Sequence, residues 1–240
     1  MEDYPLKEFY SEIFTSYDRV NRIFTFGRDV SWRKKAAAKC LAHDPGRVLD
    51  VCTGTGDFIF ELASRSSGSI SLTGYDFSRE MLDLAERKKF ELRSQNPGMP
   101  DIDFVEGEVG NMPFENDFFD AMGITFGIRN LIYENSNAGL HLSEMIRVLR
   151  PGGKLVILES SRPANAVWRL FNSFYLRFVL PYLGGLVSGN VKAYKYLAKS
   201  SRNYYTIKQM GNILAEAGMH RIKGEPLFLG SVMLIIAEKK

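Results

Sequence analysis

The sequence predicts an α/β fold: a doubly wound, mostly parallel sheet of seven strands, with a helical cap before the first strand and a helical insertion after the fifth. Two patterns predict this fold. Between residues 48 and 158, five apolar runs alternate with helix-like segments, which is typical of parallel strands joined by crossover helices. Residues 221–224 and 228–237 then follow a last helix with no helix between them, so we expect them to complete the sheet as an antiparallel pair.

Length and composition predict one domain. The chain has 240 residues, of which 45% are hydrophobic, and no linker rich in Pro, Gly and Ser divides it. We therefore expect a single domain over residues 1–240, with the cap in residues 1–45 and the insertion in residues 162–203. The N-terminus shows no secretory pattern and two cysteines make no disulfide framework, so we expect a cytoplasmic protein. We expect no metal site.

The charge of the chain argues against a nucleic-acid partner. Its formal net charge of +3 is well short of the excess that nucleic-acid binders carry. Two basic clusters nevertheless stand out, one in residues 33–39 and one in residues 192–202. Each is either a solvated helix face or a contact for a membrane surface.

The predicted cap carries apolar and aromatic residues at helical spacing between residues 8 and 40, with Gly27 as a break. Its aromatic side chains are expected to pack in a core. For Tyr17 a second interpretation stays open, in which the ring lies over a bound ligand.

Residues 48–57 predict a strand, a tight glycine turn and the start of a helix. The strand contains Asp50, Gly54 and Gly56 follow with one residue between them, and Asp57 is placed to cap the helix. Glycines let the backbone bend sharply and approach a ligand closely, and the N–H groups at a helix start face such a ligand. We therefore predict a binding site at this turn.

The identity of the ligand follows from what the turn lacks. A dinucleotide-binding turn needs a third small residue, but Ile59 occupies that position. Asp50 would repel a pyrophosphate and suits an ammonium or sulfonium group. The second apolar run, residues 70–75, ends at Asp76, from where a carboxylate can accept ribose hydroxyls. Adenosine with a cationic tail describes S-adenosylmethionine.

Polar residues also follow the other predicted strands. The third strand, residues 102–105, leads to Glu108, the fourth, residues 118–124, to Thr125, and the fifth, residues 154–158, to Glu159. Because parallel strands place their carboxyl ends at one edge of the sheet, we expect these side chains to converge with Asp50 and Asp76. For Glu108 alone, an exposed loop acid is an equally simple interpretation.

The insertion is rich in large apolar residues from residue 166 to residue 187. Arg169, Arg177 and Pro181 interrupt this stretch, which argues against a transmembrane helix. The segment is longer than a crossover between strands needs, so we interpret it as a lid or substrate-binding insertion for an apolar substrate. Ordinary core packing is the alternative.

Several motifs together resemble the class I S-adenosylmethionine-dependent methyltransferases, whose Rossmann-like fold is the one predicted above. The resemblance is closer to the quinone-biosynthesis C-methyltransferases, the UbiE family of demethylmenaquinone and polyprenyl-methoxybenzoquinol methylases. It covers nearly the whole chain, and its most specific motif is Phe-Gly-Ile-Arg-Asn. The motifs lie in residues 17–32, 49–57, 126–130 and 147–161.

By this resemblance, Thr55, Asp76, Glu108, Val109 and Thr125 match positions that contact the cofactor. The complete predicted cofactor site is Tyr17, Asp50, Gly54, Thr55, Gly56, Asp76, Phe77, Glu108, Val109 and Thr125. The chain also departs from the family pattern. The departures are Thr25, Asp29, Arg150 and Ile235. We expect them to leave the cofactor site untouched, but they put the exact quinone in doubt.

The resemblance implies methyl transfer to a ring carbon of a quinol, which becomes nucleophilic when it loses a hydroxyl proton. Arg129 is the predicted catalytic cation, because a permanent positive charge lowers the pKa of the quinol oxygen, and Asn130 is predicted to donate a hydrogen bond to it. Glu159 is a hypothetical general base. A loop salt bridge is the alternative for Arg129, and the three lone histidines are more typical of structural or exposed positions.

A polyprenyl quinol lives in the bilayer, so we expect a transient contact with the inner face of a membrane. The side chains expected to line the tail channel are Trp168, Phe171, Phe174 and Phe178. Those expected to face anionic lipid are Lys192, Lys195 and Lys199. A homodimer stays open.

Four other functions are weighed against this one. A nicotinamide-dependent oxidoreductase would need a small residue in place of Ile59, and a nucleic-acid amino-methyltransferase usually carries an Asn/Asp-Pro-Pro-aromatic motif after the fourth strand. A methyltransferase for another small apolar acceptor, or a non-catalytic scaffold that binds the cofactor, would keep every cofactor contact. The choice between naphthoquinol and benzoquinol also stays open.

Overall fold

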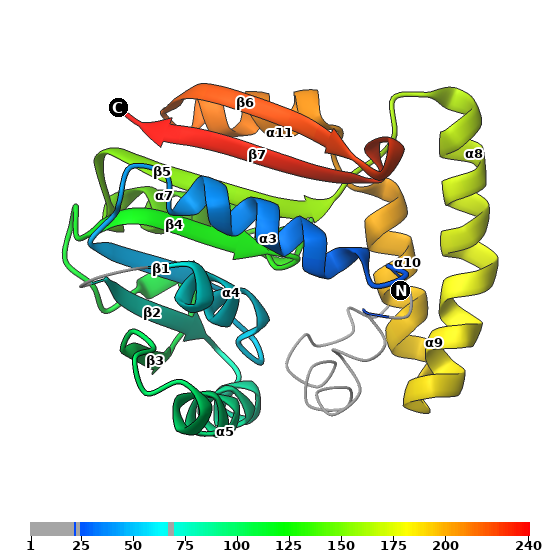
Figure 1. Cartoon of the computed structure of the whole chain (residues 1–240). Coiled ribbons are helices and arrows are strands. Elements are labelled where there is room, and N and C mark those ends of the chain that lie inside the picture. The colour runs from blue at the N-terminus through cyan, green and yellow to red at the C-terminus, as the bar shows by residue number, and fades with distance from the viewer. Residues whose placement is uncertain (1–21, 23–24, 67–69) are drawn as a thin grey trace.

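The computed structural model describes residues 22, 25–66 and 70–240 (Figure 1). Tyr17 and most of the predicted cap lie outside these residues. The strands are β1 (Arg47–Val51), β2 (Ser71–Asp76), β3 (Ile102–Glu106), β4 (Phe119–Thr125), β5 (Leu149–Ser160), β6 (Met219–Leu227) and β7 (Val232–Lys239). The α-helices are α3 (Arg28–Cys40), α4 (Asp57–Arg65), α5 (Arg79–Gln95), α6 (Ile128–Ile132), α7 (Ala138–Val148), α8 (Ala166–Phe174), α9 (Leu180–Ser188), α10 (Val191–Asn203) and α11 (Ile207–Glu216).

The seven strands form one sheet in the order β3-β2-β1-β4-β5-β7-β6. Strands β1 to β5 are parallel, whereas β7 is antiparallel to both β5 and β6. The chain moves outward from β1 to β3 and then returns to the other side of β1 with β4. In an open parallel sheet, the crevice beyond the strand ends at such a reversal is where ligands bind. The predicted fold class is confirmed.

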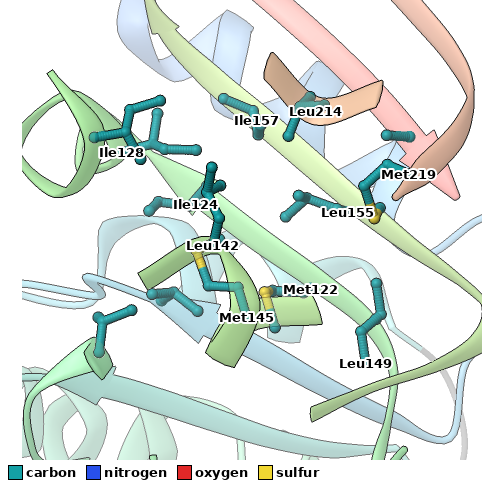
Figure 2. Close-up of a cluster of buried hydrophobic side chains, with 14 of the residues drawn as sticks. Met122, Ile124, Ile128, Leu142, Met145, Leu149, Leu155, Ile157, Leu214 and Met219 are labelled. Carbon is teal, nitrogen blue, oxygen red and sulfur yellow. The ribbon is translucent and has the colours of Figure 1, made fainter. Parts of the chain in front are cut away.

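Helices cover both faces of the sheet, and each face has its own apolar core. On one face, β4 and β5 pack against α7 and α11, as Figure 2 shows for Ile124, Leu155 and Leu214. On the other face, α3 and α4 pack through Ala36, Phe58 and neighbouring side chains. Each large aliphatic side chain buried in this way stabilises the fold by roughly 1.5–3 kcal/mol. These two cores hold the strand ends in fixed positions.

Several boundaries differ from the sequence prediction. Asp57 is the first residue of α4 and not its cap, because Gly56 occupies the cap position with φ of 88°. Strand β5 begins at Leu149, five residues before the predicted start at residue 154, and its pairing with β4 shifts register between Phe119 and Ala121. A short 3₁₀ turn, Phe228–Gly230, replaces the expected start of β7. None of these differences changes the order of the elements.

The predicted insertion consists of α8, a π-helical segment (Tyr175–Val179), α9 and α10. In Figure 1 these helices stand together beyond the carboxyl ends of the parallel strands, and α9 packs against α10. Among the described residues, no helix has the length and apolar character that crossing a membrane requires. The insertion therefore flanks the edge of the sheet at which ligands are expected.

Candidate active site

A cavity of about 410 Å³ opens at the carboxyl ends of β1, β2 and β4. It brings together seven of the side chains and glycines that the sequence assigns to the cofactor: Gly54, Thr55, Asp76, Phe77, Glu108, Val109 and Thr125. Asp50 and Gly56 do not line this cavity within the described part of the chain, although both belong to the same strand-turn-helix segment. Five side chains at strand ends were expected to converge. Three of them, Asp76, Glu108 and Thr125, meet at this cavity.

The turn after β1 is built from backbone conformations that favour glycine. Gly54 and Gly56 have φ of 55° and 88°, and Cys52 adopts φ of 56° without being glycine. A non-glycine residue in this region carries strain, and such strain is often found where a ligand binds. The Gly54 N–H donates to Asp76 Oδ2 at 2.9 Å, which joins the turn to the end of β2.

Asp76 is held by the backbone around it. Its Oδ1 accepts the N–H of Ser78 at 2.9 Å, and Ser78 in turn caps α5 by accepting the N–H of Met81. Burial raises the pKa of the Asp76 carboxyl, while the hydrogen bonds from Ser78 and Gly54 lower it. These bonds fix the orientation of a carboxylate that lines the cavity.

Asp50 has a different environment from the one the sequence predicts. Its side chain is 1% exposed, and Oδ2 accepts the hydroxyl of Thr53 at 2.7 Å. Burial raises the pKa of Asp50 to about 7. Asp50 is thus a buried acid within the glycine turn, and the carboxylates that line the cavity are Asp57, Asp76 and Glu108.

A second cavity, of about 360 Å³, lies between the strand ends and the insertion. Its walls are largely apolar and include Trp168, Phe171 and Tyr175 from α8 and the π-helical segment. Trp168 is fixed by a hydrogen bond from Nε1 to Ser231 Oγ at 2.8 Å and by an edge-on contact with Phe228. The insertion thus supplies one wall of a chamber suited to an apolar ligand.

Phe126 lines both cavities. It has φ of 57°, again in the left-handed region, and its N–H donates to Leu158 O at 2.8 Å, which ties it to β5. The next residue must be glycine, because a Cβ on Gly127 would lie 2.5 Å from Cys52 Cβ. The strained turn after β4 therefore places one aromatic side chain between the two chambers.

Arg129 and Glu159 line the second cavity and are almost fully buried, with 4% and 1% of their surfaces exposed. Arg129 Nε lies 3.8 Å from Glu159 Oε1, and the Arg129 N–H donates to Oε2 at 3.3 Å. Arg129 Nη1 donates to the hydroxyl of Ser200 on α10. Arg129 Nε is buried and makes no hydrogen bond among the described residues.

Glu159 is engaged by further donors. The N–H and the hydroxyl of Ser160 both donate to Oε1, at 2.7 Å and 2.8 Å. Nearby, Ser161 is 2% exposed, lines the same cavity and has a hydroxyl without a hydrogen-bond partner among the described residues. The second cavity therefore combines apolar walls with a small buried group of polar atoms.

Asn130 faces away from its neighbour Arg129. It lines the first cavity, whereas Arg129 lines the second. The two residues lie in the short helix α6, where successive side chains point in different directions. The two members of the Phe-Gly-Ile-Arg-Asn motif thus contact different chambers.

Sequence reasoning missed Arg33, which it placed in a basic cluster of a solvated or membrane-facing helix. The structure buries Arg33, with 7% exposed, and places it in the wall of the first cavity. Its partner is Asp29, whose Oδ2 accepts from Nη1 at 2.6 Å, and Thr25 Oγ1 donates to Asp29 Oδ1 at 2.9 Å. Thr25 and Asp29, two departures from the family pattern, thus hold a residue of the first cavity without lining that cavity themselves.

His141 and Asn135 also line the first cavity without having been predicted there. His141 Nδ1 lies 2.8 Å from Leu131 O, which fixes the ring. No motif marks these residues, since they reach the cavity from a loop and a helix that sequence spacing alone does not place beside it.

Comparison with known proteins identifies the family of this chain. A family model described as the ubiE/COQ5 methyltransferase family matches residues 1–239. The chain is 38% identical over 234 residues to a ubiquinone/menaquinone biosynthesis C-methyltransferase UbiE of Geotalea daltonii, covering 98% of this chain and 96% of that protein. It is 37% identical over 231 residues to a demethylmenaquinone methyltransferase of Thermus thermophilus, covering 96% and 99%.

Solved structures show the same fold at lower identity. A SAM-dependent methyltransferase from Thermotoga maritima, described as a possible histamine N-methyltransferase, superimposes with a TM-score of 0.65 at 18% identity and covers 98% of this chain and 99% of its own. The sheet is thus that of the class I methyltransferases. With its fold, its two chambers and a family match over nearly its whole length, this chain belongs to the ubiE/COQ5 methyltransferase family.

Proposed function

We propose that this chain transfers the methyl group of S-adenosylmethionine to a ring carbon of a polyprenyl quinol in quinone biosynthesis. The observation that carries the proposal is the pair of cavities that share Phe126 in their walls, one at the strand ends that contains several carboxylates and one beside the insertion that is more strongly apolar. A methyl donor and an apolar acceptor need such a pair, because the two reacting atoms must meet while each ligand keeps its own environment.

The first cavity fits the proposed cofactor. Its glycine turn allows close approach of a ligand, and Asp76 and Glu108 are carboxylates at strand ends that can accept hydroxyl or amine donors. Thr55, Val109 and Thr125 complete the wall at the positions that the family resemblance assigns to the cofactor. When bound, S-adenosylmethionine supplies an electrophilic methyl group on its sulfonium. The structure supports this assignment and also orients Asp76 through two backbone hydrogen bonds.

The second cavity fits a quinol ring with an apolar tail. Arg129 supplies a permanent cation in a buried chamber, where charge interactions are less screened than in water. A quinol hydroxyl beside it loses its proton more easily, since the cation stabilises the phenolate, and the electron density moves to the ring carbons. Glu159 and Ser200 hold the guanidinium in place.

The role of Glu159 as general base stays a prediction. Its carboxylate accepts from Ser160 and from the backbone of Arg129, so the structure also supports a positioning role. The hydrogen bond predicted from Asn130 to the quinol is not supported by its place in the first cavity. We assign Asn130 to the cofactor side.

We propose further that the outer face of the insertion contacts the inner face of an anionic membrane. Trp168 and Phe171 line the second cavity as expected, but Phe174 and Phe178 are 59% and 50% exposed and lie outside its wall. Other exposed apolar side chains on the same helices are Val167, Leu170, Tyr182, Leu183 and Leu186. This concentration of exposed apolar side chains on the insertion favours lipid as its partner.

The neighbouring helix supplies the charge that such a contact needs. Lys192, Lys195 and Lys199 are exposed on α10, which packs against α9. Positive charges beside an apolar face match the negative surface of the cytoplasmic leaflet. The apolar cavity behind this face would then receive the quinol from the bilayer.

Transfer of a labelled methyl group to short-tailed acceptors tests the function. We expect purified protein to label demethylmenaquinol or a methoxybenzoquinol in the reduced form and not in the oxidised form, because the quinone lacks the ionisable hydroxyl. Comparing the two quinols decides between the naphthoquinol and benzoquinol reactions. Labelling of neither quinol, together with labelling of another small apolar molecule, would assign the site to that acceptor instead.

A further inference from the structure

The wall of the first cavity contains a cation that the proposed reaction does not use. Arg33 on α3 is buried and is the single side chain with a permanent positive charge among the described residues that line this cavity. Asp57, the first residue of α4, lines the same cavity, and its Oδ2 lies 3.7 Å from Arg33 Nη1. Two opposite charges therefore face one end of the chamber.

Arg33 has one donor, Nε, that no other described residue uses. Its close partner is Asp29, one turn earlier in α3, with Oδ2 2.6 Å from Arg33 Nη1. Its Nε is buried and has no hydrogen-bond partner among the described residues. A buried donor without a partner costs free energy, and a guanidinium can bind a carboxylate through two parallel hydrogen bonds. The arrangement is thus completed by an anion.

Three cations lie around Asp57, and one of them is hydrogen-bonded to it. Lys88 Nζ donates to Oδ1 at 3.2 Å, while Arg33 and Arg22 are 3.7 Å and 3.9 Å from Oδ2. Oδ2, which these longer distances leave without a close cation, keeps acceptor capacity for an ammonium group. An anion at Arg33 and an ammonium at Asp57 would lie side by side, as they do in an α-amino acid.

The location of Arg33 and Asp57 indicates which end of a bound ligand they would contact. Arg33 Cζ lies 5.5 Å from the centroid of the Phe126 ring, which also lines the second cavity. Asp76 and Glu108 lie at the ends of β2 and β3, which are farther from β4 in the order of the sheet. The cavity thus has an acidic end, suited to a nucleoside, and an end with paired charges beside the acceptor chamber.

We infer that Arg33 and Asp57 bind the amino-acid end of the cofactor, with the α-carboxylate at the Arg33 guanidinium and the α-ammonium at Asp57. This inference rests on the proposed function, since it takes S-adenosylmethionine as the ligand. Both residues are binding residues and not catalytic ones. Their effect is to place the sulfonium centre, which lies between the nucleoside and the amino acid, close to Phe126 and the acceptor.

The test is direct binding measured by titration calorimetry, with no acceptor present. The ligands are S-adenosylhomocysteine, its analogue without the carboxylate, and its analogue without the amino group. Arg33→Gln should weaken S-adenosylhomocysteine about 10- to 100-fold and leave the analogue without the carboxylate unchanged, since a charged hydrogen bond is lost only from the first. Asp57→Asn should weaken S-adenosylhomocysteine to a similar degree and leave the affinity for the analogue without the amino group unchanged.

Arg22→Gln is the matched control, because Arg22 pairs with the same two carboxylates but does not line the cavity. We expect it to change none of the three affinities by more than about twofold. If Arg33→Gln unfolds, Arg33→Gln combined with Asp29→Asn removes the buried acid that would be left alone, and Arg33→Lys keeps the charge without the planar fork.

Equal losses for all three ligands in the Arg33 and Asp57 variants would overturn the inference and leave a purely structural role. Unchanged affinity for S-adenosylhomocysteine would overturn it as well. Failure of the wild-type protein to bind S-adenosylhomocysteine at all would instead overturn the proposed cofactor. The two failures are therefore distinguishable.

Discussion

Arg129 and Glu159 form a buried pair across neighbouring strands, with Nε 3.8 Å from Oε1 and the backbone N–H of Arg129 donating to the same carboxylate. Arg129 follows β4 and Glu159 lies near the end of β5, so the parallel pairing of these strands sets their separation. Arg129 and Glu159 both line the apolar chamber, and the buried Nε of Arg129 has no hydrogen-bond partner among the described residues.

This pair predicts distinct effects of two substitutions on catalysis. Arg129→Lys should lower kcat by about 10²- to 10³-fold, because the lysine cannot hold the same donor geometry, while the affinity for S-adenosylhomocysteine stays unchanged. Steady-state kinetics with a reduced short-tailed quinol measures the first effect and calorimetry the second. A loss of cofactor affinity equal to the loss of kcat would contradict the assignment to the acceptor.

Glu159→Gln separates a general base from a positioning residue. A base would lose most turnover and change the pH profile of kcat, whereas a positioning residue would lower kcat without moving the profile. Full turnover with an unchanged profile would contradict both roles. Arg129→Gln combined with Glu159→Gln should be more stable in urea than Arg129→Gln alone, because the single variant leaves a buried carboxylate without its cation.

Two glycines provide a matched test of the cofactor turn. Gly54 and Gly152 have φ of 55° and 74°, and a Cβ at either would meet no atom within 4 Å. Alanine at each position should therefore cost a similar free energy of unfolding, roughly 1–2 kcal/mol from backbone strain. Gly54→Ala should in addition weaken S-adenosylhomocysteine, since Gly54 lines the cavity and the methyl group would occupy it. Equal affinity in both variants would place the ligand elsewhere.

The buried Asp50 predicts a pH-dependent stability. Its pKa is raised from 3.8 to about 7, so the folded protein binds more protons than the unfolded chain between these values. The contribution of Asp50 to stability is thus largest below about pH 4, falls as pH rises to 7 and is constant above it. Three pKa units correspond to at most about 4 kcal/mol.

Asp50→Asn should remove this dependence. The variant should gain stability relative to the wild type as pH rises from 5 to 8, because the amide keeps an acceptor for the Thr53 hydroxyl and carries no charge. Urea unfolding without cofactor at the two pH values measures the difference. Asp83→Asn, at an exposed carboxylate on α5, is the control and should show little change. A gain that is the same at both pH values would contradict a raised pKa.

The outer face of the insertion predicts vesicle binding. Changing Leu170, Phe174 and Leu186 to Ser should reduce co-sedimentation with anionic vesicles severalfold, and so should changing Lys192, Lys195 and Lys199 to Glu. The matched controls are Phe90→Ser on α5 and Lys34→Glu on α3. Both side chains are exposed, and neither belongs to the insertion. Equal binding of all variants would exclude this surface as the membrane contact.

The sequence was sufficient for the fold and for much of the cofactor cavity. Apolar runs gave the strands, and the polar residues after them, Asp76, Glu108 and Thr125, meet because parallel strands end at one edge. Glycine spacing located the turn, since Gly54 requires its left-handed conformation. These features depend on local pattern and on the topology of the sheet, which are both visible in the sequence.

Other features depend on contacts between distant segments. In the sequence, nothing distinguishes Arg33 from its basic neighbours. Only the structure shows that it lies beside Asp29 and Asp57. Arg129 and Asn130 line different cavities because successive side chains of the short helix α6 point in different directions. The left-handed conformation of Phe126, just before this helix, is one that no residue preference predicts for phenylalanine. The sequence places Asp50 on a strand next to the glycine turn, which predicts that it faces the ligand. It does not tell how deeply the following turn covers the side chain, and Asp50 is buried outside the cavity wall.

Phe126 has a consequence for how the two ligand sites can be studied. It lines both cavities, and Arg33 Cζ lies 5.5 Å from the centroid of its ring. Any substitution of Phe126 therefore alters the walls of both chambers at once. Variants that are meant to separate cofactor binding from acceptor binding have to be made at residues that line one chamber alone.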